Sequence, residues 1–262
     1  MYQAFIFDQD GTIYLGDQIL PGAVDLISRL REAGCRTFFL SNNPTKTREQ
    51  YSSKLSAMGI VTPVEDVVNS SYVMVQWLLE NCPFARLFVI GEDALKHELA
   101  TAGFQLLESA AGVDIVIASF DRAFDYAKLQ IAFDAIRAGA RLVGTNPDRF
   151  CPTPSGGQPD CAAIIAAIEA CTGVKCNPIV GKPSPIMVEM ILSILDLTPE
   201  KCLVIGDRLE TDIQMGIDAG MGTCLVLTGD ATRETLALSG ISPTFVVDNL
   251  GGLQAALFGA NQ

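Results

Sequence analysis

The chain has 262 residues, of which 49% are hydrophobic, with 23 Gly and 13 Pro, a composition typical of a globular α/β protein. Its formal net charge of -12 argues against a general affinity for nucleic acid or anionic membranes. It has no apolar segment long enough for a transmembrane helix and begins on a strand-like run without a secretion leader, so we expect a cytoplasmic protein. The eight cysteines form no CxxC pair, which favours reduced thiols over disulfides or zinc ligands.

Short runs of β-branched and aromatic residues alternate along the chain with stretches of helical periodicity. We expect strands at 4–7, 36–40, 87–90, 115–118, 141–144, 202–205 and 223–227. We expect helices at 21–34, 47–59, 92–104, 126–140, 161–173 and 184–196, where apolar residues recur every three or four positions. This alternation predicts parallel sheets covered by helices, and hence a Rossmann-like α/β core.

The middle of the chain has a strand–helix alternation of its own. Pro and Cys interrupt the helical patterns at "NCPFAR" and at "VKCNPIV", on either side of this region. We therefore expect a core formed by residues 1–78 and 178–262, with residues 79–177 inserted between them as a second α/β domain.

Acidic residues follow the first expected strand and the strand at 202–205. Asp8 and Asp10 follow the first, and Asp207 and Asp212 lie in "GDRLETD" after the other. In open parallel sheets ligand sites form beyond the carboxyl ends of the strands, so the four acids are expected to gather. Their repulsion would be relieved by a hard cation, and Mg²⁺ prefers such carboxylate ligands together with phosphate oxygens.

Acids that bind a metal, a nearby lysine and a single histidine on an expected exposed helix indicate phosphoryl transfer. Asp8 could attack phosphorus and form an aspartyl phosphate. Asp10, two residues further on, could protonate the departing alkoxide and then deprotonate water. Ser41 and Asn42, at a strand-to-helix turn, suit a phosphate oxygen, and Lys182 in "VGKPSP" supplies positive charge for developing oxyanions.

Four segments, "DQDGT", "SNN", "GKP" and "GDRLETD", resemble in this order the four motifs of the haloacid dehalogenase-like (HAD) superfamily, over residues 5–228. The resemblance implies that Asp8 is both nucleophile and magnesium ligand. It implies that Asp10 is the acid/base and gives its backbone carbonyl to the metal. Asp207 would complete the coordination, with Asp212 as an outer-shell partner.

The long insert between the second and third motifs resembles the cap of the NagD-like, p-nitrophenylphosphatase-type subfamily, and "TNPDRFCP" supports that placement. The resemblance implies that Asn43 joins the phosphate-binding residues and that Asn146 and Asp148 face the substrate; an Asn-Pro-Asp turn is the alternative. The stretch Gly156–Ala162 lacks the second glycine of the usual "PGxG"-like element and looks somewhat like the sugar phosphatases of arabinose operons. Relatives with such caps imply a monomer or homodimer.

We therefore expect a Mg²⁺-dependent phosphatase of small-molecule phosphomonoesters, with sugar phosphates favoured and p-nitrophenyl phosphate as an artificial substrate. A phosphomutase on the same scaffold is an alternative, as is a receiver-like signalling domain that accepts phosphate without turnover. Family comparison argues against a dehalogenase, which lacks the second acid found here as Asp10. A dinucleotide-binding oxidoreductase is disfavoured because no G-x-G-x-x-G follows the first strand.

Overall fold

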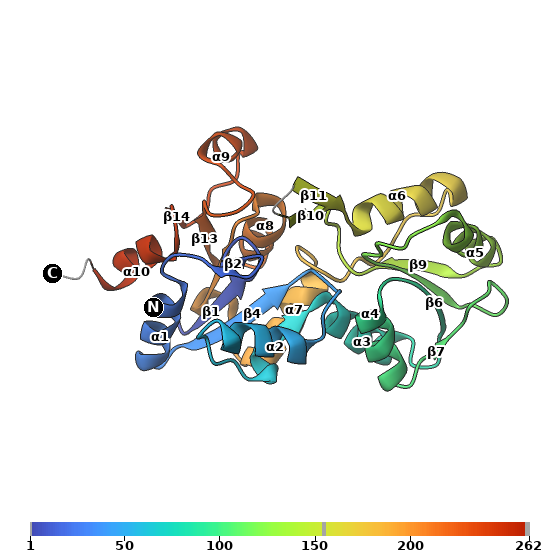
Figure 1. Ribbon diagram of the computed structural model, residues 1–262, viewed down its shortest axis with the longest axis horizontal. Coiled ribbons are helices and arrows are strands. Elements are labelled where there is room, and N and C mark those ends of the chain that lie inside the picture. The colour runs from blue at the N-terminus through green and yellow to red at the C-terminus, as the bar shows by residue number, and fades with distance from the viewer. Residues whose placement is uncertain (1, 154–155, 260–262) are drawn as a thin grey trace. The chain divides into compact units, whose positions relative to one another are not determined.

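The computed structural model describes residues 2–153 and 156–259, which form two compact units. The first unit comprises Met1–Ser41, Glu49–Val68 and Val188–Gln262, and the second comprises Asn42–Arg48 and Asn69–Met187. Residue 79, where the inserted domain was expected to begin, lies inside helix α3 (Ser70–Asn81), and the second unit contains this whole helix (Figure 1).

The first unit is built on a sheet of six strands. In order across the sheet they are β14 (Phe245–Val247), β13 (Gly222–Val226), β12 (Cys202–Gly206), β1 (Ala4–Asp8), β4 (Arg36–Ser41) and β5 (Val67–Asn69). Strand β1 pairs in parallel with both β12 and β4, and β13 pairs in parallel with β12 and β14. A short antiparallel hairpin of β2 (Tyr14–Leu15) and β3 (Gln18–Ile19) follows β1. The parallel core expected from the sequence is thus confirmed.

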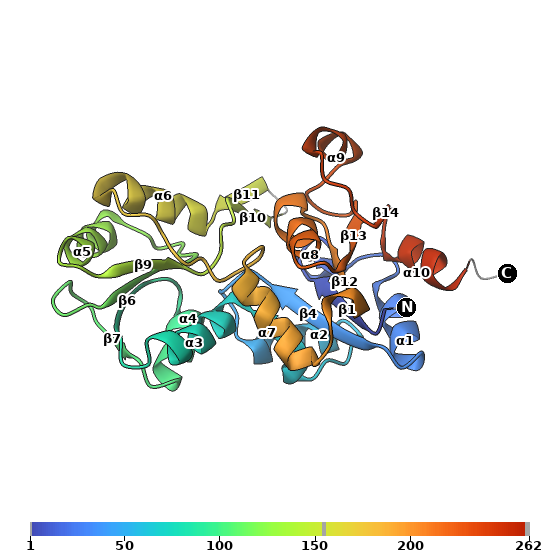
Figure 2. The same cartoon turned by 180° about the vertical axis from the view of Figure 1, so that it is seen from behind.

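Helices and helical turns connect these strands. They are α1 (Ala23–Glu32), α2 (Arg48–Ala57), α7 (Pro185–Leu195), α8 (Gln214–Asp218), α9 (Arg233–Ser239), α10 (Leu250–Phe258), and the turns η1 (Val64–Asp66), η2 (Pro199–Lys201) and η3 (Leu209–Ile213). Helices α1 and α10 lie side by side, as Figures 1 and 2 show. Alternate residues of β1, Phe5 and Phe7, pack with Leu26 of α1 and Leu253 of α10 in one core.

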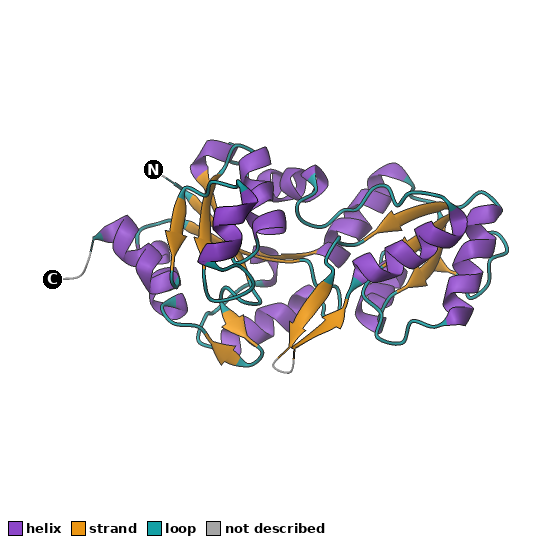
Figure 3. Ribbon diagram, turned by 90° about the horizontal axis from the view of Figure 1, so that it is seen from above, coloured by secondary structure: helices purple, strands orange, loops and turns teal. Residues whose placement is uncertain are grey.

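The second unit has a parallel sheet of four strands. Their order is β7 (Gln105–Leu106), β6 (Arg86–Ile90), β8 (Ile115–Ala118) and β9 (Arg141–Gly144). Helices α3 and α4 (Asp93–Thr101) cover one face, and α5 (Tyr126–Arg137) and α6 (Cys161–Thr172) cover the other (Figures 1 and 2). An antiparallel pair, β10 (Phe150–Thr153) and β11 (Gly156–Pro159), precedes α6 (Figure 3).

All seven expected strands are present in the structure, as are the expected helices. The edge strands β5 and β14 and the hairpins were not predicted. The stretch Gly156–Ala162 forms β11 and the start of α6, the latter as expected from residue 161. Among the described residues no helix is both long and apolar enough to cross a bilayer. The eight cysteines are free thiols; Cys171 is exposed, while Cys161, Cys202 and Cys224 are buried.

Candidate active site

Two neighbouring strands of the first unit carry acids where they end. Strand β1 ends at Asp8, and strand β12 ends at Gly206, immediately before Asp207. The two strands pair in parallel, with Phe7 opposite Ile205. Because paired parallel strands end at the same edge of a sheet, Asp8 and Asp207 lie next to each other there.

A third acid comes from the helical turn η3. This is a π-helical turn, closed by a hydrogen bond of 3.2 Å that the Ile213 N–H donates to the Arg208 carbonyl. Such turns are rare in proteins overall, and those that do occur are often found at functional sites. Asp212 lies on η3, is 1% exposed, and accepts a hydrogen bond of 3.2 Å from the Arg208 N–H through one carboxylate oxygen. The π-turn therefore directs a buried carboxylate toward the ends of the strands.

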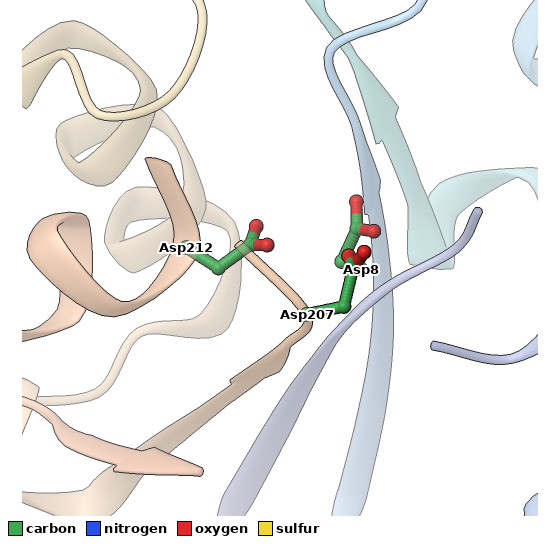
Figure 4. A group of neighbouring side chains, drawn as sticks. All are labelled: Asp8, Asp207 and Asp212. Carbon is green, nitrogen blue, oxygen red and sulfur yellow. The ribbon is translucent and has the colours of Figure 1, made fainter. Parts of the chain in front are cut away.

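The side chains of Asp8, Asp207 and Asp212, hereafter the acidic group, gather at one place. One carboxylate oxygen of each lies within 4.8 Å of the others, and Figure 4 shows the three side chains turned toward one another. Asp207 and Asp212 are almost fully buried, so water screens their charges poorly. Three carboxylates so close together destabilise a fold unless a cation compensates them, and Mg²⁺ prefers oxygen ligands of this kind. The donor set fits a divalent metal.

The carboxylate of Asp10 is outside the acidic group, although the sequence predicted that four acids would gather. The chain turns sharply after β1, where the N–H groups of Thr12 and Ile13 donate to the Gln9 carbonyl at 3.2 and 2.8 Å. This turn brings Tyr14 back beside Asp10, with which it forms an isolated β-bridge, and the Tyr14 hydroxyl donates a hydrogen bond of 3.0 Å to the side-chain oxygen of Gln9. Burial raises the pKa of Tyr14 well above its usual value, and the charge of Asp10 raises it further. The phenol therefore keeps its proton.

A loop that the sequence analysis missed holds the acidic group in place. Thr228 follows β13, and its hydroxyl donates a hydrogen bond of 2.6 Å to the carbonyl of Gly11. The Asp230 N–H donates to a carboxylate oxygen of Asp207 at 2.7 Å, and the Ala231 N–H donates to the backbone carbonyl of Asp207 at 3.0 Å. Polar residues after an apolar strand, the signal that marked the other loops, could have identified this one.

Two glycines allow the side chain of Asp207 to approach its neighbours closely. A Cβ atom at Gly11 would lie 2.5 Å from a carboxylate oxygen of Asp207, and Gly11 also has a φ of 86°. A Cβ atom at Gly229 would lie 2.5 Å from Cγ of Asp207. Both distances are far shorter than van der Waals contact, so any larger residue would displace the carboxylate.

Ser41 ends β4, the strand on the other side of β1. Because Asp8 pairs with Leu40, Ser41 lies at the same edge of the sheet as the acidic group. Ser41 is buried, and its hydroxyl lies 3.5 Å from that of Tyr51. The structure therefore brings this candidate residue to the end of β1, as the motif order predicted.

The other candidate residues lie in the second unit, where the side chain of Asn42 connects three of them. The Lys182 N–H donates to the side-chain oxygen of Asn42 at 2.8 Å, and the Asn42 amide donates to the Lys182 carbonyl at 3.1 Å and to Asp148 at 3.3 Å. The Asn146 amide donates to the backbone carbonyl of Asn42 at 2.9 Å. Asn42, Asn146 and Lys182 are buried, so these bonds fix the backbone around Lys182.

Asn146 and Asp148 also form a local turn. The Asp148 N–H donates to the Asn146 side-chain oxygen at 3.1 Å, which is the Asn-Pro-Asp turn considered as the alternative from the sequence. Asn43 shapes another turn, because its side-chain oxygen accepts hydrogen bonds from the N–H and the hydroxyl of Thr45, at 3.0 and 2.6 Å. These three side chains have clear structural roles in the segments that carry the motifs.

Comparison with known proteins agrees with the motif order. A family model described as haloacid dehalogenase-like hydrolase matches residues 5–105, and a second HAD-type hydrolase model matches residues 179–253. The chain is 37% identical to the sugar-phosphatase AraL of Bacillus subtilis, covering 94% of this chain and 89% of the relative. It is 35% identical to an acid sugar phosphatase of Staphylococcus aureus, covering 98% of both.

Solved structures show the same architecture over nearly the whole chain. A 4-nitrophenylphosphatase of Thermotoga maritima superposes with a TM-score of 0.91 at 36% identity, covering 96% of both chains. NagD of E. coli superposes with a TM-score of 0.86 at 28% identity, covering 95% of this chain and 97% of NagD. The chain therefore belongs to the haloacid dehalogenase-like hydrolase family and, within it, to the NagD-like branch of phosphoric monoester hydrolases.

Proposed function

We propose that this protein hydrolyses small phosphomonoesters, with sugar phosphates as the favoured class, through an aspartyl-phosphate intermediate on Asp8 and with Mg²⁺ as cofactor. The observation that carries the proposal is the acidic group, in which Asp8 at the end of β1 lies beside two buried carboxylates. Acids gathered this closely repel one another and destabilise the fold unless a cation offsets their charge.

In the first step an oxygen of Asp8 attacks the phosphorus of the substrate. A new oxygen–phosphorus bond forms on Asp8 while the bond between phosphorus and the ester oxygen breaks. The carboxylic acid of Asp10 gives its proton to the departing oxygen, which leaves as an alcohol. In the second step Asp10, now a carboxylate, takes a proton from water as the water attacks phosphorus, and Asp8 is released together with inorganic phosphate.

Magnesium would be held by the carboxylates of Asp8 and Asp207 and by the backbone carbonyl of Asp10, with Asp212 as an outer-shell partner. Bound there, the ion supplies positive charge that offsets the negative charge of the carboxylates and of the phosphoryl group. The chain supports this role through its own hydrogen bonds, since the loop around Asp230 fixes the side chain of Asp207.

We assign recognition of the phosphoryl oxygens to Ser41, Asn42, Asn43 and Lys182. A lysine ammonium acts as a compact positive charge, which suits the oxyanions of a phosphoryl group. The hydrogen bonds between Asn42 and the backbone of Lys182 support a joint role for the second and third motifs. We assign to Asn146 and Asp148 the role of supporting Asn42. The Asn146 amide donates a hydrogen bond to the backbone carbonyl of Asn42, and Asp148 accepts one from the Asn42 side-chain amide.

The substrate class follows from the named relatives. The relatives from Bacillus subtilis and Staphylococcus aureus are named sugar phosphatases, and the structure from Thermotoga maritima is named a 4-nitrophenylphosphatase. We therefore expect p-nitrophenyl phosphate to serve as an artificial substrate. A small metabolite as substrate does not require a protein partner, and a monomer or homodimer remains our expectation.

The proposal is tested by measuring phosphate release from a panel of sugar phosphates, other small phosphate esters and p-nitrophenyl phosphate, with Mg²⁺ and after chelation with EDTA. We expect many turnovers with Mg²⁺ and none after chelation, with activity restored by added Mg²⁺. Asp8→Asn should lower the rate roughly a thousandfold or more, because it removes the nucleophile. Asp218→Asn, which changes an exposed acid on α8, is the matched control.

Three outcomes would contradict the proposal. Full activity of Asp8→Asn would exclude the covalent mechanism. Release of a single phosphate per protein molecule would favour a receiver-like phosphate acceptor. An isomerised phosphate ester in place of inorganic phosphate, detected by chromatography of the products, would identify a phosphomutase.

A further inference from the structure

The second unit has a sheet edge of the kind at which ligands bind. Strands β6, β8 and β9 pair in parallel, so their carboxyl ends lie together, and ligand sites in open parallel sheets form beyond such ends. The Thr145 N–H donates to the Ala118 carbonyl at 3.0 Å, and the Thr145 hydroxyl donates to that of Ser119 at 2.9 Å. The Gly181 N–H donates to the Thr145 carbonyl at 2.8 Å, which attaches the segment of Lys182 to this edge. The loop after β8 therefore shares an edge with a residue assigned to the phosphoryl group.

An arginine–glutamate pair joins the loops after β6 and β8 at this edge. The Nε and Nη2 atoms of Arg122 each donate to one carboxylate oxygen of Glu92, both at 2.6 Å, and the Arg122 backbone N–H adds a bond of 3.4 Å. The guanidinium lies 5.8 Å from the centre of the Phe120 ring, within cation–π range. The hydrogen bonds from Arg122 also hold the pKa of Glu92 below its ordinary value, so both groups are charged at neutral pH.

The loop that carries Arg122 is itself fixed by a buried acid. Asp121 is 6% exposed and accepts hydrogen bonds from the Lys128 ammonium at 2.6 Å and from the Ala123 N–H at 2.9 Å. The Lys128 ammonium also donates to the Ala123 carbonyl at 2.9 Å. The guanidinium of Arg122 is thus held in one direction before any ligand arrives, which lowers the entropy cost of binding to it.

The outward side of the pair suits hydroxyl groups. The side chain of Arg122 is 58% exposed and that of Glu92 is 20% exposed, so a ligand can reach both. Because Nε and Nη2 face Glu92, the Nη1 amino group lies on the other side of the planar guanidinium, and carboxylate oxygens have further lone pairs. A hydroxyl both donates and accepts, as this combination requires. The charges of the pair cancel, so it favours a neutral polyol over a leaving group that carries its own charge.

We propose that Arg122, held in place by Glu92, determines specificity by hydrogen-bonding the hydroxyl groups of the sugar in a sugar phosphate. The inference rests on the proposed function, since it concerns recognition of the leaving group in that reaction. Hydrogen bonds that involve a charged group are stronger than those between neutral groups. The p-nitrophenyl group has no hydroxyl to offer the pair, so the two kinds of substrate should respond differently when the pair is removed.

The test compares kcat/KM of wild-type protein and of Arg122→Met, with Mg²⁺, on the best sugar phosphate of the panel and on p-nitrophenyl phosphate. Methionine has a long side chain but no N–H donor. Loss of a hydrogen bond from a charged group should lower kcat/KM about tenfold or more on the sugar phosphate and less than about threefold on p-nitrophenyl phosphate. Glu92→Gln, which weakens the hold on Arg122, should show the same selectivity with a smaller fall.

The same sheet provides a matched control at its opposite edge. Arg86, the first residue of β6, pairs with Asp114 in the same two-bonded manner, from Nε at 2.9 Å and from Nη2 at 3.1 Å. Arg86→Met therefore removes a similar exposed ion pair at the amino ends of the strands. It should change kcat/KM on neither substrate.

The outcomes separate this inference from the proposed function. Equal falls on both substrates in Arg122→Met, no fall on the sugar phosphate, or the same selective fall in Arg86→Met would overturn the role of Arg122 and leave phosphate hydrolysis intact. If circular dichroism showed Arg122→Met to be unfolded, Glu92→Gln would decide by the same criteria. A wild-type protein active on p-nitrophenyl phosphate but on no sugar phosphate would also overturn the inference. A wild-type protein that releases phosphate from neither would overturn the proposed function itself.

Discussion

The buried position of Asp212 leads to a prediction in which one substitution raises stability without metal and weakens the stabilisation that metal provides. Asp212→Asn keeps the shape of the side chain and an oxygen that can accept the hydrogen bond from the Arg208 N–H. What it removes is one of three negative charges whose oxygens lie within 4.8 Å of one another. In metal-free protein we therefore expect the substitution to raise the melting temperature.

The size of the effect follows from the geometry. Two unit charges at 4.8 Å repel by about 3.5 kcal/mol at an effective dielectric constant of about 20. Asp8 is partly exposed, and its charge is screened, so about 1 to 3 kcal/mol is a reasonable net gain on removing Asp212. For a protein of this size, 1 kcal/mol corresponds to about 2 to 4 °C, which gives an increase of about 2 to 12 °C.

Magnesium should narrow the difference between the two proteins. At a hundred times its dissociation constant a ligand stabilises the folded state by about 2.7 kcal/mol, so wild-type protein should melt at a clearly higher temperature with Mg²⁺. Loss of an outer-shell partner typically weakens metal binding about 10 to 100-fold, which would remove from about half to most of that gain in Asp212→Asn. The stabilisation by metal should therefore be smaller in the variant.

The measurement is differential scanning fluorimetry of both proteins in EDTA and in MgCl₂, with Asp218→Asn as the control that should match wild type in both buffers. The reasoning would be refuted if Asp212→Asn melted at or below the wild-type temperature in EDTA and gained as much from Mg²⁺ as wild type does.

Two further predictions concern the loop after β13 and the second unit. Gly229→Ala should displace the side chain of Asp207 and raise the Mg²⁺ concentration for half-maximal activity about tenfold or more. The circular dichroism spectrum should stay unchanged. An unchanged metal requirement would show that the close approach of Gly229 to Asp207 is dispensable. The hydrogen bond from Arg122 lowers the pKa of Glu92 below its ordinary value of 4.5. The stabilisation from this pair is therefore fully present above about pH 4.5, the ordinary pKa, and is lost as the pH falls through the lowered pKa. Arg122→Gln should therefore lower the melting temperature by a few degrees at most at pH 7 and by less at pH 3, and an equal loss at both pH values would contradict this.

The strands at the centre of each sheet were predictable because both of their faces are buried. Residues 202–205 and 115–118 are continuous apolar runs, and such runs are typical of strands covered by helices on both sides. The edge strands β5 and β14 are three residues long, too short to show a period. In the hairpin of β10 and β11, Pro and Gly occupy strand positions, and these residues usually indicate loops.

The motif residues could be predicted, while the bonds that position them could not. The approach of Asp8 and Asp207 follows from the parallel pairing of β1 with β12, which strand order in this fold class makes predictable. The turn at Gln9, which follows Asp8 directly, is closed by backbone hydrogen bonds that only the structure reveals. The pairing of Asn42 with Lys182 joins residues far apart in the chain, and no local pattern records such a contact.

The pairing of β1 with β12 also has a consequence for synthesis of the protein. Asp8 and Asp207 are separated by about 200 residues of sequence, so a growing chain carries its first aspartates long before their partners exist. Contacts over such distances form late in folding. During translation the second unit, whose segments precede Val188, can become structured while the carboxylates of the acidic group are still apart.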